Sequence, residues 1–143
     1  MSYQINEIGS NQCIVLNGLV NIDTIKEIDQ FMRSRPDYAK AKFHIWDFRK
    51  VEEINIPLNI ESQFPDIESI RSHWDYNHKL AIIPDTNNAY EAYLIFADSI
   101  RVSTGWECKI FAEYDDALNW CNPWFNNYLS LFFLIELDMD INF

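Results

Sequence analysis

Short apolar runs alternate with helix-like stretches along this chain, and this alternation limits its possible folds more than any other feature. Three runs, over residues 13–16, 43–48 and 80–83, are rich in large apolar side chains but too short to be buried helices. Between the first two runs, isoleucines recur at helical spacing from Ile22 to Ile28. Strands that alternate with helices predict an α/β fold with a mainly parallel sheet.

Turn and capping residues predict where each element begins and ends. Residues 3–8 and 13–18 are expected to form a hairpin whose second strand is closed by Gly18, and a first helix is expected to run from an Asn21 cap and to end near Ser34-Arg35-Pro36. Further strands are expected over 42–48, 79–84 and 106–111. A second helix is expected over 57–74. A third helix is expected to begin after an Asn88 cap, with Tyr90, Leu94, Ala97 and Ile100 as its inward stripe. A fourth is expected to begin after an Asp115 cap and to end before Pro123. The expected order is ββαβαβαβα, with about five strands in a mixed, mainly parallel sheet and about four packed helices.

Length and charge limit the class of protein. The 143 residues fit one domain, expected over residues 1–125, with an apolar extension over 126–143. An apolar content of 48% excludes a disordered chain. The net charge of −11 argues against nucleic-acid and anionic-membrane binding. Most of this charge lies in the second half of the chain, because residues 73–143 carry 3 Lys and Arg against 11 Asp and Glu. We therefore expect any protein partner to present a basic surface.

The cysteines and the N-terminal residues indicate a reducing compartment. Cys13, Cys108 and Cys121 are too widely spaced for a zinc site and odd in number, so we expect three buried thiols. The first residues show no basic and apolar segments of a secretory signal. A cytoplasmic location is expected.

Several segments together resemble bacterial SpoIIAA-like proteins, which have the fold of STAS domains (sulfate transporter and anti-sigma factor antagonist). The resemblance rests on Ile14-Val15-Leu16-Asn17-Gly18, Trp46-Asp47-Phe48-Arg49, Leu80-Ala81-Ile82-Ile83-Pro84, Ala89-Tyr90 and residues 110–120. It spans about residues 3–122 and implies a non-enzymatic module that binds a protein or a ligand.

One position departs from the pattern of anti-sigma factor antagonists. In those proteins, a serine that begins a helix after the strand containing the Asp is the phosphorylation switch. The matching stretch here, residues 53–58, contains no Ser or Thr, and Ser62 lies too far along the chain. The resemblance therefore implies that this switch is absent or rebuilt.

Asp47 and Arg49 are the first candidate ligand-binding residues. A carboxylate beside a guanidinium at a strand end can act as an acid or clamp an anion. The alternative is that Asp47 makes turn hydrogen bonds while Arg49 pairs with Glu52 or Glu53. His73 and His78, with Asp75, form a second polar group, but their spacing does not suit a metal site and exposed loop imidazoles are expected instead.

Aromatic residues give a third candidate site. Tyr90, Tyr93 and Phe96 are expected mainly in the core, and they also offer one wall of an apolar ligand pocket.

The apolar segment 128–137 is too short to span a membrane. Left exposed, it would favour aggregation, so it is expected to pack on its own domain or across a homodimer interface. The expected interface residues are Tyr128, Leu131, Phe132, Phe133 and Ile135.

These observations favour a non-catalytic STAS-like interaction module, with no cofactor and no metal expected. The alternative is a carrier or sensor of a small apolar, lipid-like ligand. An enzyme is a third hypothesis, for which Asp47, Arg49, His73 and His78 are the residues to test.

Overall fold

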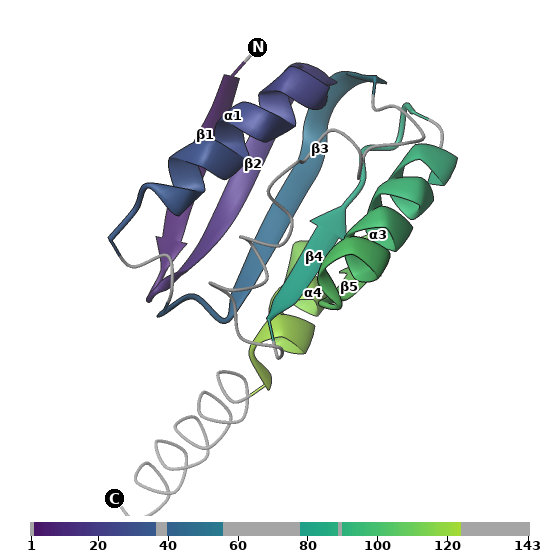
Figure 1. Cartoon of the computed structure of the whole chain (residues 1–143). Coiled ribbons are helices and arrows are strands. Elements are labelled where there is room, and N and C mark those ends of the chain that lie inside the picture. The colour runs from purple at the N-terminus through teal and green to yellow at the C-terminus, as the bar shows by residue number, and fades with distance from the viewer. Residues whose placement is uncertain (1, 37–39, 56–77, 89, 124–143) are drawn as a thin grey trace, which may run out of the picture.

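A five-stranded mixed sheet forms the centre of the described chain, which in the computed structural model comprises residues 2–36, 40–55, 78–88 and 90–123 (Figure 1). The strands are β1 (Ser2–Ile8), β2 (Asn11–Asn21), β3 (Phe43–Asn55), β4 (Lys79–Ile83) and β5 (Glu107–Ile110), and they lie in that order across the sheet. β1 is antiparallel to β2, whereas β2 to β5 are parallel. The expected mixed, mainly parallel sheet is confirmed.

Three helices are described: α1 (Ile22–Arg33), α3 (Tyr90–Thr104) and α4 (Tyr114–Cys121). α1 and α3 pack on one face of the sheet and α4 packs on the other (Figure 1). The expected order ββαβαβαβα is therefore found only in part, because the helix expected over 57–74 lies outside the described residues.

α1 begins as the sequence predicts. The Asn21 side chain accepts a hydrogen bond from the Thr24 backbone N–H, and the Thr24 hydroxyl accepts one from the Asn21 backbone N–H. This reciprocal cap satisfies two backbone donors that the first turn would otherwise leave unpaired. Ile25, Ile28 and Met32 then enter the core.

Gly18 does not close β2 as expected. The strand continues to Asn21, and its register with β3 shifts on either side of Asn17 and Gly18. Gly18 has a positive φ of 71°, which a glycine adopts without steric cost and which suits a bulge. β3 is correspondingly longer than predicted, because its charged second half, from Arg49 to Asn55, remains in the sheet.

The ends of α3 and α4 test the other capping predictions. Gly105, with a φ of 76°, follows α3 as expected. α4 begins one residue before the expected Asp115 cap, with Glu113 in the cap position and no side-chain hydrogen bond there. At the other end of α4, the Lys79 ammonium donates to the Trp120 carbonyl at 3.0 Å, which ties the helix to β4.

The core has two layers. Between the sheet and the α1–α3 pair lie Ile14, Leu16, Trp46, Phe48, Ile82, Tyr93 and Phe96. On the other face, Ala117 and Cys121 of α4 pack against Cys13, Phe43, Ile45, Ala81 and Ile83 of the sheet. All three cysteines are buried free thiols, which confirms their expected role, and burial raises the pKa of Cys13 to about 11 and those of Cys108 and Cys121 to about 12. Such thiols are weak nucleophiles.

Candidate functional site

Asp47 and Arg49 form a bidentate ion pair on the α4 face of β3. The Arg49 Nε and Nη2 atoms donate to the two carboxylate oxygens at 2.9 and 2.7 Å, and the Arg49 backbone N–H adds a third bond to Oδ1 at 3.0 Å. Because residues two apart in a strand share a face, the extended backbone itself brings the two side chains together. The prediction that Arg49 pairs with Glu52 or Glu53, while Asp47 serves a turn, is wrong because β3 does not end at Asp47.

The two members of this pair differ in exposure. The Asp47 side chain is 6% exposed, whereas that of Arg49 is 47% exposed. The hydrogen bond to Asp47 raises the pKa of Arg49 above its ordinary value, and the guanidinium carbon lies 6.0 Å from the centroid of the Tyr114 ring. Both carboxylate oxygens of Asp47 are engaged, so the pair can bind a polar group through the outer edge of Arg49 but offers no free base.

A second polar centre lies between β4 and α3. The Asp85 carboxylate accepts hydrogen bonds from the backbone N–H groups of Asn87 and Asn88, each at 2.9 Å, and from the Tyr93 hydroxyl. Burial alone would raise the pKa of Asp85, but the bonds from Tyr93, Asn88 and Asn87 outweigh it and lower that pKa. Burial raises the pKa of Tyr93. Asp85 therefore fixes the loop that leads into α3 and is itself fully bonded.

The predicted aromatic site is divided between the core and the surface. Tyr93 and Phe96 are buried, and their rings lie 5.2 and 6.5 Å from that of Phe48. Tyr90 and Leu94 are instead 52% and 42% exposed, so the predicted inward stripe of α3 is wrong in its first half, whereas Ala97 and Ile100 do pack in the core as predicted. Tyr90 therefore does not line an apolar pocket together with Tyr93 and Phe96 in the way that the sequence predicted.

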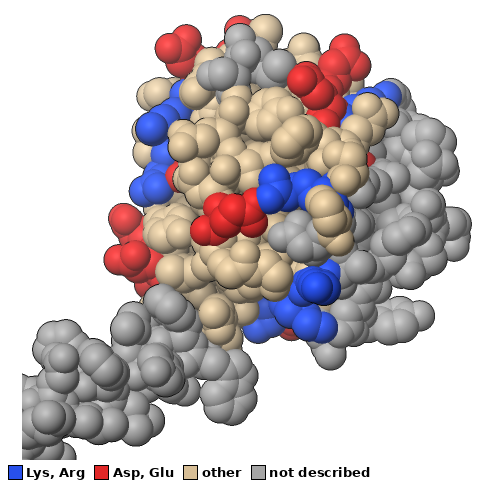
Figure 2. Space-filling view, turned by 90° about the vertical axis from the view of Figure 1, so that its left-hand side faces the viewer, with Lys and Arg blue, Asp and Glu red and all other residues tan. Residues whose placement is uncertain are grey.

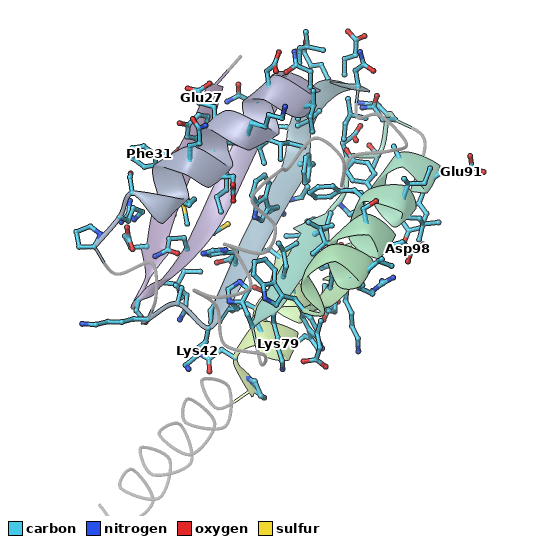
Figure 3. All side chains as sticks on the ribbon, viewed as in Figure 1. Glu27, Phe31, Lys42, Lys79, Glu91 and Asp98 are labelled. Carbon is cyan, nitrogen blue, oxygen red and sulfur yellow. The ribbon has the colours of Figure 1, made fainter. Side chains whose placement is uncertain are left out.

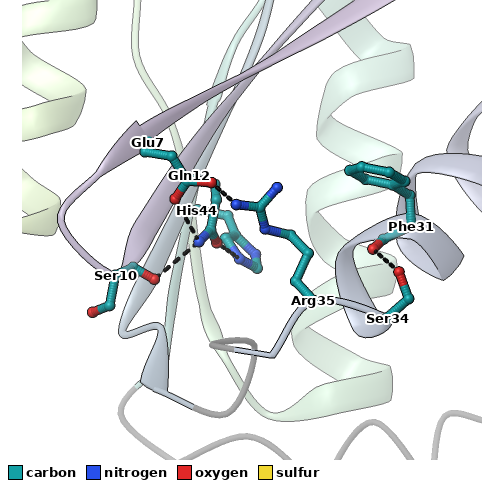
Figure 4. Close-up of polar contacts among 7 residues, drawn as sticks. All are labelled: Glu7, Ser10, Gln12, Phe31, Ser34, Arg35 and His44. Carbon is teal, nitrogen blue, oxygen red and sulfur yellow. Dashed lines mark hydrogen bonds and ion pairs between the residues drawn. The ribbon is translucent and has the colours of Figure 1, made fainter.

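A third polar group is buried under α1, at the end of the sheet where β2 begins (Figure 4). The Gln12 Oε1 atom is hydrogen-bonded to the His44 Nε2 atom at 2.9 Å. The Gln12 Nε2 atom donates to the Ser10 carbonyl at 3.0 Å and to the carboxylate of Glu7, which also forms an ion pair with Arg35. The sequence offered no signal for Gln12, because it lies between a turn cluster and an apolar run and its partner His44 is 32 residues away.

Two histidines meet within this group. The His44 ring lies 4.9 Å from that of His78, which lies 4.6 Å from Trp106. Burial lowers the pKa of His44 well below its usual value and that of His78 to about 3, so both rings are neutral near pH 7. The expectation of an exposed imidazole at His78 is wrong, and His73 lies outside the described residues.

The described residues bring no three His, Cys, Asp or Glu side chains together as metal ligands. None of the helices in this part of the chain is both long enough and apolar enough to cross a bilayer. The expected interface residues Tyr128, Leu131, Phe132, Phe133 and Ile135, and the extension 126–143 as a whole, lie outside the described residues.

Solved structures identify the fold. An uncharacterised protein of the DUF3478 family from Shewanella loihica PV-4, described as having a SpoIIAA-like fold, matches with a TM-score of 0.52 and 13% identity, over 84% of this chain and 92% of its own. The anti-sigma factor antagonist SpoIIAA in its unphosphorylated form matches with a TM-score of 0.50 and 10% identity, over 82% and 96% of the two chains.

The phosphorylated form of SpoIIAA, from Bacillus, matches with a TM-score of 0.50 and 11% identity, over 82% of this chain and 97% of its own. No family model and no curated protein matches the sequence. The chain therefore has the SpoIIAA-like fold of STAS domains, as its sequence segments suggested.

Proposed function

We propose that this chain is a non-catalytic regulatory module that acts by binding another protein. The observation that carries the proposal is the SpoIIAA-like fold, since SpoIIAA is an anti-sigma factor antagonist. Its polar chemistry agrees with a binding role. The carboxylates of Asp47 and Asp85 are saturated by hydrogen bonds, and His44 and His78 are buried and neutral. A general acid or base needs a free group near the surface.

The proposed partner presents a basic surface. Three exposed acidic residues lie at the start of α4: Glu113, Asp115 and Asp116. Arg49 lies beside Tyr114, but its charge is balanced by Asp47. This end of α4 is therefore a negative surface suited to Lys and Arg side chains of a partner.

Neutralising these acids tests the proposal. The triple variant Glu113→Gln/Asp115→Asn/Asp116→Asn should retain fewer proteins from a native lysate than the unaltered chain, and the lost proteins should also be those that moderate salt releases. The control variant Glu27→Gln/Glu91→Gln/Glu107→Gln makes the same charge change at scattered exposed positions. Figure 3 shows Glu27 and Glu91 on different helices. Equal retention by all three proteins would contradict a partner bound at α4.

We further propose that the module works without the phosphoserine switch. Residues 53–58 contain no hydroxyl side chain, and β3 runs through Asn55. Intact-mass measurement of protein isolated from its native cells should show no phosphate on the chain, and peptide mapping would locate any phosphate that is found. A phosphate at Ser62, which lies outside the described residues, would show that the switch has been moved rather than lost.

A second candidate function is the binding of a small apolar, lipid-like ligand. One observation favours it: the Trp46 indole Nε1 is buried among the rings of Phe48 and Phe96, and no residue in the described part of the chain accepts a hydrogen bond from it. A buried indole N–H ordinarily finds an acceptor, and an amphipathic ligand could supply one. Native mass spectrometry should then show an adduct that Trp46→Phe weakens. A ligand-free mass for the unaltered protein would exclude this candidate.

A further inference from the structure

Within the described part of the chain, one edge of β1 is unpaired along its whole length. The strand pairs with β2 in an unbroken antiparallel register from Ser2 to Ile8, and no other described strand lies on its outer side. Edge strands are commonly protected against further pairing by Pro, Lys or a bulge. β1 has none of these among its seven residues. Figure 2 looks onto this side of the molecule, where side chains other than Lys, Arg, Asp and Glu cover much of the described surface, with an acidic and a basic patch near the centre.

We propose that β1 pairs antiparallel with β1 of a second copy, about a two-fold axis through Ile5. An axis perpendicular to the sheet keeps the helices of both copies on the same sides and places each residue opposite one that points to the same face. Ile5 then faces Ile5, and Gln4 faces Asn6. Tyr3 faces Glu7, so the one charge on the strand meets a neutral side chain and no like charges are opposed.

The position of α1 beside this edge also favours pairing with a second copy of the chain. Tyr3 and Ile5 pack against the cluster that contains Ile25 and Ile28 of α1, which places α1 over the β1 side of the sheet. On the outer side of α1, toward this edge, Figure 3 shows Glu27 and Phe31. Phe31 is 47% exposed. Two copies joined at β1 bring their α1 helices side by side, so Phe31 would become buried between them.

Charge substitutions at Gln4 and Asn6 test the register directly, because both side chains are exposed and lie on the sheet face away from α1. Gln4→Lys/Asn6→Lys opposes two pairs of like charges, and so does Gln4→Glu/Asn6→Glu. Each double variant alone should dimerise about tenfold more weakly than the unaltered chain. An equimolar mixture of the two should recover the dimer as a heterodimer, and Gln4→Lys/Asn6→Glu should dimerise by itself.

Sedimentation equilibrium over a range of concentrations gives these dissociation constants, and far-UV circular dichroism confirms that each variant is folded. Phe31→Ser should also weaken the dimer several-fold, whereas Val102→Ser, at a 77% exposed position on α3, should not. The proposal fails if the unaltered chain is monomeric throughout, or if like and opposite charges give the same dissociation constant. A dimer sensitive only to Phe132→Ser/Phe133→Ser would place the interface in the C-terminal extension instead.

Discussion

The exposed Arg49 and the nearly buried Asp47 depend on each other to different degrees. Arg49 can be solvated by water, whereas removal of the guanidinium leaves Asp47 with the Arg49 backbone N–H as its one donor among the described residues. We therefore predict that Arg49→Met lowers the free energy of unfolding by about 1–3 kcal/mol, the cost of leaving a buried acceptor underbonded. Urea unfolding measures this loss.

Asp47→Asn supplies the control for this prediction. In that background the buried charge is already gone, so Arg49→Met should cost less than about 1 kcal/mol. An equal loss in both backgrounds would show that Arg49 contributes through packing or the unfolded state rather than through Asp47.

The buried histidines make stability depend on pH. Their folded-state pKa values lie below the ordinary value of 6.5, with that of His78 at about 3. The unfolded chain therefore binds protons that the folded chain does not. Stability should fall as the pH drops from about 6.5 toward 3, by about 1.4 kcal/mol per pH unit for each such histidine.

His78→Phe tests the origin of this pH dependence. The substitution keeps an aromatic ring beside His44 and Trp106 but cannot be protonated. Urea unfolding midpoints between pH 8 and pH 4.5 should fall less steeply for the variant than for the unaltered protein. Parallel pH profiles would assign the acid sensitivity to carboxylates instead.

Single residues were the least predictable part of the sequence. The proximity of Asp47 and Arg49 in the chain suggested a site, but only the continuation of β3 shows that they share a face. Gln12 and His78 each contact His44, which comes from a distant segment of the chain, and local patterns do not report such contacts. Asp85 was missed because its role depends on Tyr93, one helical turn into α3.

At the scale of elements, Asp85, which bonds the loop before α3, and Asp115, the predicted cap of α4, should behave differently. Asp85→Ala removes the acceptor of the Asn87 and Asn88 backbone N–H groups and leaves the buried Tyr93 hydroxyl without its acceptor. We predict a loss of about 2–4 kcal/mol in the free energy of unfolding. Asp115→Ala, at an exposed position that makes no cap, should change stability by no more than about 0.5 kcal/mol.

Thermal or urea unfolding of both variants checks this contrast. Tyr93→Phe in the Asp85→Ala background should recover part of the loss, because no hydroxyl then remains buried without a partner. No recovery would mean that Asp85 acts mainly through the loop backbone.

Strand positions and the sheet were well predicted because apolar runs and turn residues are local signals. The Asn21 cap and the glycine after α3 were correct for the same reason. Element ends failed where tertiary pairing extends a strand past its apolar part, as in the charged half of β3. On α3 the prediction was correct for Ala97 and Ile100 but wrong for the first turn, because Tyr90 and Tyr93 are equally apolar in sequence and packing against Phe48 selects Tyr93.

At the scale of the whole molecule, the SpoIIAA-like sheet combines a strongly acidic chain with one strand edge that carries a single charge. Repulsion between chains of net charge −11 keeps most surfaces apart, so contact between copies is favoured only where charges are sparse. The β1 edge meets that condition. The acids at the start of α4 remain available to a basic partner in such a dimer, because α4 packs on β3 and β4, away from β1.

Native mass spectrometry of the freshly purified protein tests the central claim, an interaction module rather than a ligand carrier, most directly. It reports oligomeric state and bound small molecules in one spectrum. We predict a species of twice the 17.0 kDa chain mass with no added mass. A monomer that carries a small-molecule adduct would contradict both the interaction module and its proposed self-pairing.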